Sequence, residues 1–396
     1  MSQKILHVVS SMDPVFGGVS KAVRTIATSL MENGIVNEVV SLDDIQADFI
    51  NNDSFKLHAL GSSKNPWAYN SKLLPWLKDN LHYYDVVMVH GLWLYSSYVV
   101  YLAINSMRKQ DRLKYFVMPH GMLDPYFQKA EGRRLKAIRN WLYWKLIEYK
   151  VVNNADGLLF TCEEERLLAK QPFKPYKPKK EYIVGLGVDV PPIHNADMDK
   201  AFQNCCKSLE NRPFLLFLSR IHQKKGVDLL LEAYKRCISE VDLDLVIAGP
   251  GCESDYGKYL LKTVSEDSKL KSRVHFTGML SGNAKWGAFY NADAFILPSH
   301  QENFGIAVVE ALACGTPVLI SDKVNIWREI KNGNGGFVEQ DDLRGTTNLI
   351  LKWVALKTHE KKIMEQNAKK TFLEHYAIQL VAKRLVELLI KPLEIA

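Results

Sequence analysis

Short runs of apolar residues alternate with amphipathic segments along the whole chain. The runs are rich in Val, Ile and Leu, and each ends in a small or polar residue. They cover residues 5–11, 86–90, 115–121, 157–161, 213–219, 243–249, 273–278, 294–299 and 317–321. Strands that alternate with helical segments predict parallel sheets with helices on both faces. The pattern therefore predicts an α/β fold, with any ligand site beyond the carboxyl ends of the strands.

The alternation pauses between about residues 182 and 212, where Pro191-Pro192 and small polar residues interrupt it. A chain of 396 residues is long enough for two domains. We therefore expect two Rossmann-like domains with parallel sheets that face a central cleft. The predicted division is an N-terminal domain over 1–190, a linker over 191–212, a C-terminal domain over 213–377, and a C-terminal helix over 378–396 that packs back on the N-terminal domain.

The composition indicates a soluble globular protein, with 47% hydrophobic and 24% charged residues. A net charge of +7 is mild. It suits an anionic ligand or a membrane surface better than a nucleic acid, which usually needs a steeper basic balance. The six cysteines form no CxxC pair and no metal-binding spacing with histidine. We expect reduced thiols, a cytoplasmic location and no bound metal or cofactor.

Two segments raise the question of a membrane. Residues 86–107 carry no charge, which allows a membrane span by length, but a buried strand, a loop and a helix explain the His-Gly and Ser-Ser steps better. Residues 133–150 form a basic, aromatic-rich amphipathic segment. This segment is either a surface helix or a helix that attaches to anionic lipid on the inner face of the membrane.

The segment SHQENFGIAVVEALACGTPVLIS, residues 299–321, holds two carboxylates within an otherwise uncharged stretch. A helix is expected from near Gly305 to Gly315, with Glu302 before its start and Glu310 in its second turn. At about 1.5 Å per residue, the two carboxylates are roughly 10 Å apart along the axis. Glu310 could accept both hydroxyls of a ribose, or it could be an ordinary solvated helix residue.

This segment resembles the SxxExFGxxxxEAxAxGxPV signature of the family 4 retaining glycosyltransferases of the GT-B fold. Further matching segments follow the family's order along nearly the whole chain. They are FGGVSKAV, VHGLW, PHGMLDP, FLSRIHQKKGVDLLLEAY, VIAGPG, HFTGMLSG and FYNADAFILPS. The resemblance implies two Rossmann-like domains and the transfer of a sugar from a nucleoside diphosphate donor, most often UDP.

The resemblance also implies roles for individual residues. Glu310 would bind the ribose, and Glu302 would lie beside the donor sugar. Arg220 and Lys225 would hold the diphosphate, which agrees with the need of a dianionic leaving group for cations. The remaining implied donor contacts are the backbone amides of Asn303, Phe304 and Gly305, the glycines Gly17 and Gly18, the nucleobase neighbours Met279 and Leu280, and His120 beside the sugar.

His90, in the similar VHGLW segment, is a candidate acceptor contact. Asp242 and Asp244 form an Asp-x-Asp pair, which binds a metal–diphosphate complex in another transferase fold. Here the pair enters a predicted strand, so we interpret it as a polar strand start.

The sequence thus predicts a retaining, metal-independent hexosyl- or hexuronosyltransferase that acts on a glycan or lipid-linked saccharide in cell-surface polysaccharide synthesis. The catalytic residues would be Arg220, Lys225, His120 and Glu302. A nucleotide-sugar epimerase of the same fold and a non-catalytic nucleotide-sugar-binding protein are the alternatives. A pyridoxal-phosphate phosphorylase shares the fold as well.

Overall fold

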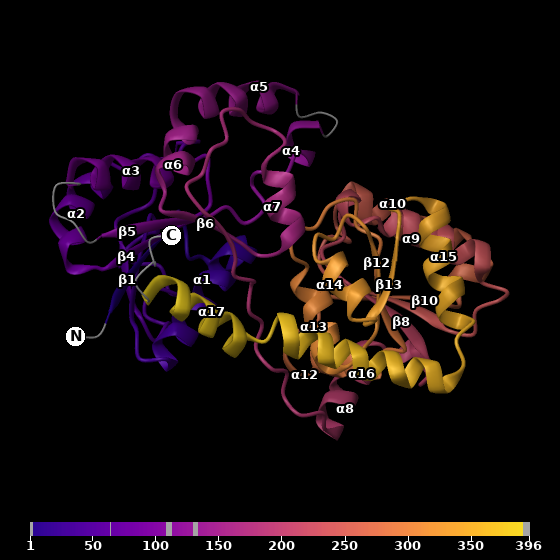
Figure 1. The fold of residues 1–396 in the computed structure, drawn as a ribbon. Coiled ribbons are helices and arrows are strands. Elements are labelled where there is room, and N and C mark those ends of the chain that lie inside the picture. Colours follow the sequence, from indigo (N-terminus) through magenta and orange to yellow (C-terminus); the bar gives the residue numbers. More distant parts are fainter. Residues whose placement is uncertain (1–2, 64, 108–112, 130–133, 391–396) are drawn as a thin grey trace. The chain divides into compact units, whose positions relative to one another are not determined.

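The chain folds into two compact units, each built on one parallel sheet (Figure 1). A computed structural model describes residues 3–63, 65–107, 113–129 and 134–390. Unit 1 comprises residues 1–187 and 378–396, and unit 2 comprises residues 188–377. The expected architecture of two Rossmann-like α/β domains is confirmed.

Unit 1 contains a seven-stranded sheet in the order β3-β2-β1-β4-β5-β6-β7. Every pair of neighbouring strands is parallel. The strands are β1 Lys4–Val8, β2 Val36–Ser41, β3 Lys56–Ala59, β4 Val86–His90, β5 Lys114–Met118, β6 Gly157–Phe160 and β7 Glu181–Ile183. Apolar side chains of the central strands, such as Leu6, Val87 and Val117, are fully buried and form the core of the unit.

The helices of unit 1 connect these strands. They are α1 Gly18–Glu32, α2 Leu73–Asn80, α3 Tyr95–Met107, α4 Tyr126–Lys129, α5 Arg134–Tyr143, α6 Tyr149–Asn154, α7 Glu163–Ala169 and α17 Ile378–Ile390. Short turns of helix lie at Pro14–Phe16, Leu81–Tyr83 and, as a π-helix, at Trp144–Glu148. Helix α17 follows all of unit 2 in the sequence but packs against α1 in unit 1.

Unit 2 contains a six-stranded parallel sheet in the order β10-β9-β8-β11-β12-β13. The strands are β8 Phe214–Leu218, β9 Asp244–Ala248, β10 Val274–Gly278, β11 Ala294–Leu297, β12 Val318–Ser321 and β13 Gly336–Glu339. The side chains of β9, β11 and β12 are all buried, as expected for strands that are covered on both faces.

Several helices of unit 2 pack against one another. The helices of this unit are α8 Ala196–Cys205, α9 Val227–Cys237, α10 Asp255–Glu266, α11 Ser268–Lys271, α12 Gly282–Asn291, α13 Ile306–Cys314, α14 Trp327–Asn332, α15 Leu343–Val354 and α16 Thr358–His375, with 3₁₀ turns at Lys207–Leu209 and Gln223–Lys225. Helix α9 packs against α15, whereas α12 packs against both α8 and α13, and α13 against α16.

Each apolar run that predicted a strand contains one in the structure. Strands β2, β3, β7 and β13 were not predicted; β3, β7 and β13 lie toward the sheet edges and are only partly buried, so they lack a continuous apolar run. Residues 191–212, interpreted from the sequence as a linker, contain α8, which packs on α12 within unit 2. The charge-free stretch 86–107 forms β4, a loop and α3. Among the described residues, we find no helix with the length and apolar character needed to cross a membrane.

A row of polar side chains, of which His120 is only partly buried, crosses the sheet of unit 1. His7 in β1 bonds to Asn37 in β2 through Nε2 and to His90 in β4 through Nδ1, both at 2.9 Å. His90 in turn bonds to His120, just after β5, at 3.0 Å. Burial lowers the pKa of His7 and of His120 to about 4, and it lowers the pKa of His90 well below its ordinary value. These imidazoles are therefore neutral at physiological pH.

These depressed pKa values predict a loss of stability in mild acid. The unfolded chain takes up protons below about pH 6.5, whereas the folded rings do not until about pH 4, so the free energy of unfolding should fall across this window. In His7→Phe, which removes one titrating ring of similar size, the slope against pH should be shallower. Urea unfolding between pH 7.5 and 4.5 measures it, with the same change at the exposed His82 as control. An equal slope in wild type and His7→Phe would contradict this assignment.

Candidate active site

Strands β8 and β11 define the point where the sheet of unit 2 changes direction. The chain adds β9 and β10 on one side of β8, then returns to place β11 on the other side and continues to β12 and β13. Loops that leave two such strands diverge to opposite faces of the sheet and leave a crevice at the carboxyl edge, which is where ligands bind in α/β proteins. The loops in question are residues 219–226 after β8 and residues 298–305 after β11.

These two loops are tied to each other by backbone contacts. The carbonyl of Lys224 accepts hydrogen bonds from the amide of His300 at 2.8 Å and from Oγ of Ser299 at 3.0 Å. Gly226 has a φ of 68°, and a Cβ at this position would lie 2.5 Å from the carbonyl oxygen of Pro298. Only glycine allows so close an approach in that conformation. The loops therefore form one preformed surface.

The charges on this surface come from both loops. Lys225 lies in the 3₁₀ turn before α9 with 8% of its surface exposed, and its Nζ forms an ion pair with Glu302. Arg220 is exposed and has no ion pair within the described residues. Burial, together with the positive charges of Arg220, Lys224 and Lys225, lowers the pKa of His222. The loop after β8 is thus a concentrated cationic segment.

Helix α13 begins where the sequence predicted. Gly305 is its N-cap in the left-handed conformation, and Gly315 ends it in the same conformation. Glu302 lies before the helix, where its backbone pairs with Val324. The N-terminal amides of a helix have no carbonyl partner within it, so they are available for ligand oxygens. Asn303 and the buried Phe304, which contacts the ring of Tyr376, complete this turn.

Glu310 is buried in α13 with 5% of its surface exposed. Its Oε1 accepts a hydrogen bond from Nζ of Lys285 in α12 at 3.0 Å. Sequence reasoning did not identify Lys285, because nothing in its local sequence marks it. This bond fixes the orientation of the carboxylate. The solvated-helix interpretation of Glu310 is wrong.

Met279 and Leu280 follow β10, on the same edge of the sheet. The side chain of Met279 is 74% exposed, whereas Leu280 is buried. The residues predicted to bind the nucleotide and the diphosphate thus lie at the carboxyl ends of β8, β10 and β11, and in α13.

The remaining predicted residues belong to unit 1. Gly17 and Gly18 lie at the start of α1, and a Cβ at either position would meet no atom within 4 Å. His90 ends β4 and His120 follows β5. Both ring nitrogens of His90 are engaged, with His7 and with His120, so the ring has no nitrogen left for the acceptor.

A cavity of about 780 Å³ lies at the carboxyl ends of β1, β2 and β4 in unit 1. This is the point where the strand order of unit 1 reverses, between β1 and β4. Most of the exposed lining is apolar, and its polar groups include the carboxylates of Asp13, Asp43 and Asp44 and several serine hydroxyls. Asp43 is held by Oγ of Ser11 and the amide of Met12.

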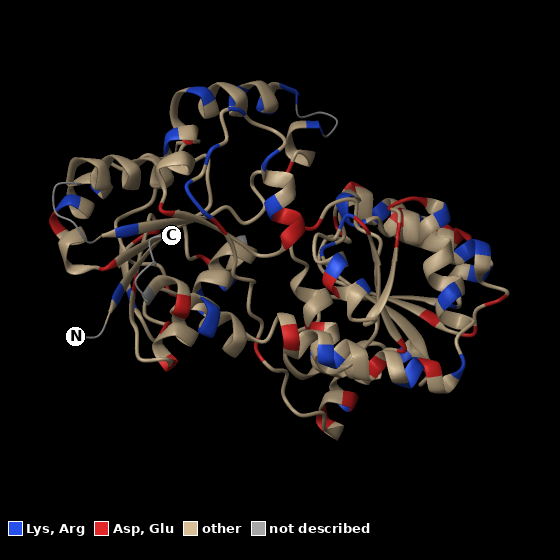
Figure 2. Cartoon of the chain, viewed as in Figure 1, with Lys and Arg blue, Asp and Glu red and all other residues tan. Residues whose placement is uncertain are grey.

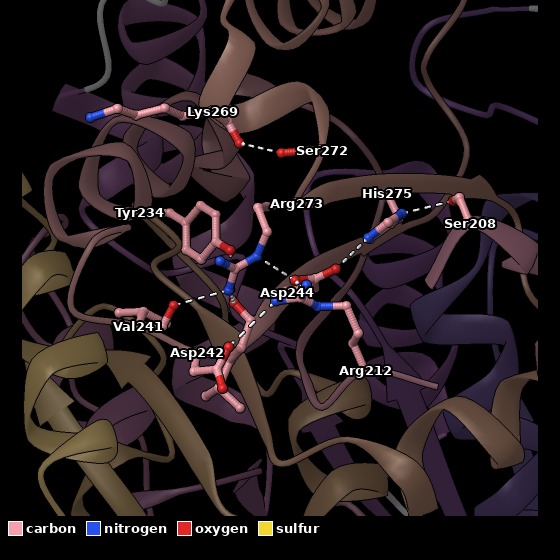
Figure 3. A network of polar contacts seen from close by, with 11 residues as sticks. Ser208, Arg212, Tyr234, Val241, Asp242, Asp244, Lys269, Ser272, Arg273 and His275 are labelled. Atoms are coloured by element: carbon pink, nitrogen blue, oxygen red, sulfur yellow. Dashed lines mark hydrogen bonds and ion pairs between the residues drawn. The ribbon is translucent and has the colours of Figure 1, made fainter. Parts of the chain in front are cut away.

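The Asp242 and Asp244 pair has a structural role (Figure 3). Asp244 is fully buried at the start of β9, and its carboxylate binds Nε of Arg273 at 2.5 Å and Nε2 of His275 at 2.8 Å. Arg212 joins the same carboxylate at 3.2 Å. This network lies at the amino edge of the strands, opposite the loops after β8 and β11. Within the described ranges, no three His, Cys, Asp or Glu side chains gather in a geometry that could hold a metal ion.

Comparisons with known proteins agree with this architecture. Residues 17–179 match a glycosyl transferase 4-like domain, and residues 203–371 match the glycosyl transferases group 1 domain. An uncharacterized glycosyltransferase of Methanocaldococcus jannaschii is 29% identical over 182 residues, which is 45% of this chain and 44% of the relative. The chain thus matches less than half the length of this relative.

Two solved structures share the fold over essentially the whole chain. A glycosyltransferase from Rickettsia africae superposes with a TM-score of 0.77 at 18% identity, covering 100% of both chains. The Anabaena protein HepE in complex with UDP and glucose superposes with a TM-score of 0.75 at 18% identity, covering 98% of this chain and 99% of the other. With both domains matched and the GT-B fold in place, the chain belongs to the family 4 glycosyltransferases of the GT-B fold.

Proposed function

We propose that this protein transfers a sugar from a UDP-sugar to a hydroxyl of a glycan or lipid-linked saccharide, with retention of anomeric configuration. The proposal rests on the ion pair of Lys225 with Glu302 at the switch point of unit 2, and on the exposed Arg220 in the same loop, which has no ion pair within the described residues. A diphosphate leaving group needs cations that are positioned before the reaction begins. The structure of the Anabaena relative holds UDP and glucose, which supports UDP as the nucleotide.

The buried carboxylate of Glu310 is the proposed ribose ligand. Lys285 holds one of its oxygens at 3.0 Å, so the group is oriented before the nucleotide arrives. Preorganisation of this kind lowers the entropic cost of binding.

The acceptor is proposed to bind in the cavity of unit 1. Its carboxylates Asp13, Asp43 and Asp44 repel an anionic group and accept hydrogen bonds from sugar hydroxyls. A saccharide with neutral hydroxyls at its reacting end fits this lining.

The proposed mechanism is a front-face substitution. The bond between the sugar and the β-phosphate breaks, an oxocarbenium-like sugar forms, and the acceptor oxygen attacks on the same face. The departing β-phosphate takes the acceptor's proton. Arg220 and Lys225 stabilise the charge that grows on this phosphate, and Glu302 holds Lys225 in place until the donor binds. We propose that this pair of cations makes the reaction independent of a metal ion.

The membrane-facing element is proposed to be α5 with the π-helix that follows. Leu135, Ile138, Trp141, Leu142 and Leu146 are exposed by 49% or more of their surface. Basic residues flank them and no acidic residue occurs before Glu148 (Figure 2). Exposed apolar side chains among Lys and Arg match an anionic lipid surface. We therefore propose a cytoplasmic enzyme that binds the inner face of the membrane. Arg133, the first residue of this segment, lies outside the described residues.

Loss of either cation should slow the chemical step. Lys225→Ala and Arg220→Ala should each lower kcat by about 10²–10³-fold at saturating donor, because a preorganised electrostatic donor is typically worth about 3–4 kcal/mol of barrier. Lys224→Ala, one residue away, is the matched control and should retain most of the activity. A panel of nucleotide sugars, followed by nucleotide release with and without an acceptor, provides the assay.

The same assay tests the alternatives. Nucleotide release that requires an acceptor supports a transferase, whereas interconversion of nucleotide sugars without release would indicate an epimerase. Wild-type activity should survive excess EDTA. Complete loss in EDTA that Mg²⁺ or Mn²⁺ restores would overturn the metal-free mechanism.

The two glutamates should have separable effects. Glu310→Ala should weaken UDP binding by about ten- to a hundredfold, since a hydrogen bond to a charged group contributes about 1.5–3 kcal/mol. Glu302→Ala should not weaken UDP binding, because it removes the carboxylate that competes with the phosphate oxygens for Lys225, but it should impair sugar transfer. Calorimetric titration with UDP, together with initial rates, measures both. If both variants lose UDP affinity equally, the proposed division between the two carboxylates is wrong.

Removing the positive charges of α5 should weaken membrane attachment. Arg134, Lys136 and Arg139 changed together to Ser should reduce binding to vesicles that contain phosphatidylserine, and the remaining binding should depend less on salt. The matched control changes Lys258, Lys262 and Lys269, which are exposed on unit 2, to Ser. Co-sedimentation with equal loss in both triple variants would show that α5 has no special role.

A further inference from the structure

The row formed by Asn37, His7, His90 and His120 follows a diagonal across the sheet of unit 1. Asn37 lies two residues before Val39, the register partner of His7. His90 lies two residues after Met88, which also faces His7, and His120 lies two residues after Met118, which faces His90. Steps of two residues keep the side chains of Asn37, His7 and His90 on one face of the sheet, and the hydrogen bond between His90 and His120 places the ring of His120 beside them. Each step also moves toward the carboxyl edge, so the row leads from the interior to the functional edge.

The hydrogen bonds of this row have a defined direction. Nδ2 of Asn37 donates to the carbonyl of Ile35 at 2.9 Å, so its Oδ1 faces His7 and must accept. Nε2 of His7 therefore carries the proton. A neutral imidazole has one donor and one acceptor. Nδ1 of His7 then accepts from Nε2 of His90, and Nδ1 of His90 accepts from Nε2 of His120.

The series of hydrogen bonds ends at His120, whose Nδ1 carries no proton and can only accept a hydrogen bond. Within the described residues, this atom has no protein partner. The backbone at His120 is also held, with a φ of 52° in the left-handed region. The amide of Gly121 donates to Oε1 of the buried Glu165 at 2.6 Å, and Oε2 of Glu165 accepts from the amide and the hydroxyl of Thr161. The ring is therefore fixed in place and in tautomer.

We propose that this row sets His120 as an obligate acceptor for a sugar hydroxyl, with His7 and Asn37 as positioning residues that act through it. The identity of the ligand as a sugar rests on the proposed function. An unprotonated nitrogen accepts a hydrogen bond from an O–H group. It cannot donate one to a carboxylate or phosphate oxygen. The position therefore selects a neutral hydroxyl over an anionic substituent, since a site built for one hydrogen-bonding partner rejects a group that leaves it unpaired.

The first test is spectroscopic and needs no activity. Two-bond ¹H–¹⁵N correlation spectra of the full-length protein labelled at histidine report the tautomer of each ring. At pH 7.5, His7, His90 and His120, assigned by single substitutions, should all be neutral with the proton on Nε2. An imidazolium, or a proton on Nδ1 of His120, would overturn the inference.

The second test breaks the row at its origin. Asn37→Leu removes the acceptor that fixes the direction, and His120 should then show a mixture of tautomers. Ser41→Ala is the matched control, because it removes another buried polar group from β2 that bonds to none of these rings. Its spectrum should match the wild type. A single Nε2–H tautomer of His120 in Asn37→Leu would show that the row does not act as proposed. The wild-type spectrum still decides the matter if Asn37→Leu does not fold.

The third test identifies the source of the hydroxyl. The ¹⁵Nδ1 resonance of His120 should move when a sugar hydroxyl donates to it. Movement with the UDP-sugar that the enzyme uses, but not with UDP, assigns the donor sugar; movement with a free methyl glycoside assigns the acceptor. In the first case Asn37→Leu should weaken UDP-sugar binding about three- to tenfold and leave UDP binding unchanged. No response to either sugar would overturn the ligand assignment. If the protein uses no nucleotide sugar, the proposed function is wrong. The tautomer assignment would not be affected, because the spectra test it without any activity measurement.

Discussion

The candidate site of unit 2 depends on the ion pair between Lys225 and Glu302. It joins the loops after β8 and β11, the two strands between which the strand order reverses. Gly226 allows the loops to approach, and hydrogen bonds from Oγ of Ser299 and the amide of His300 to the carbonyl of Lys224 hold them together. Burying an amine is costly unless a counter-charge is present. The carboxylate therefore holds a cation at the carboxyl edge of the sheet, in the same loop as Arg220, which has no ion pair within the described residues.

Both units place their polar groups at the same topological position, but the chemistry differs. In unit 2 the reversal of strand order carries cations and the N-terminus of α13, which suit a nucleoside diphosphate. In unit 1 the reversal between β1 and β4 carries a largely apolar cavity with three carboxylates, and the histidine row. A neutral acceptor at one and an anionic donor at the other would account for this difference without any further domain.

Much of this could be predicted from the sequence. The apolar runs located the central strands, and the spacing around Glu302 and Glu310 located α13 with its glycine caps. Strands β3, β7 and β13 were not predicted, because partial burial leaves them without a continuous apolar run. Lys285 and Asn37 were not identified for another reason. Their hydrogen-bond partners lie on other elements, 25 residues away along the sequence for Lys285 and 30 for Asn37. Local sequence carries no sign of such contacts. Helix α8 was not predicted for the same reason: it packs on α12, so the segment interpreted as a linker belongs to unit 2.

A crystal structure of the protein with UDP tests the proposed donor site. We expect the diphosphate beside Arg220 and Lys225, with the ribose hydroxyls on Glu310 and the Lys225–Glu302 pair loosened or broken by the phosphate oxygens. UDP bound in the cavity of unit 1, or bound at unit 2 with its diphosphate away from both cations, would contradict it.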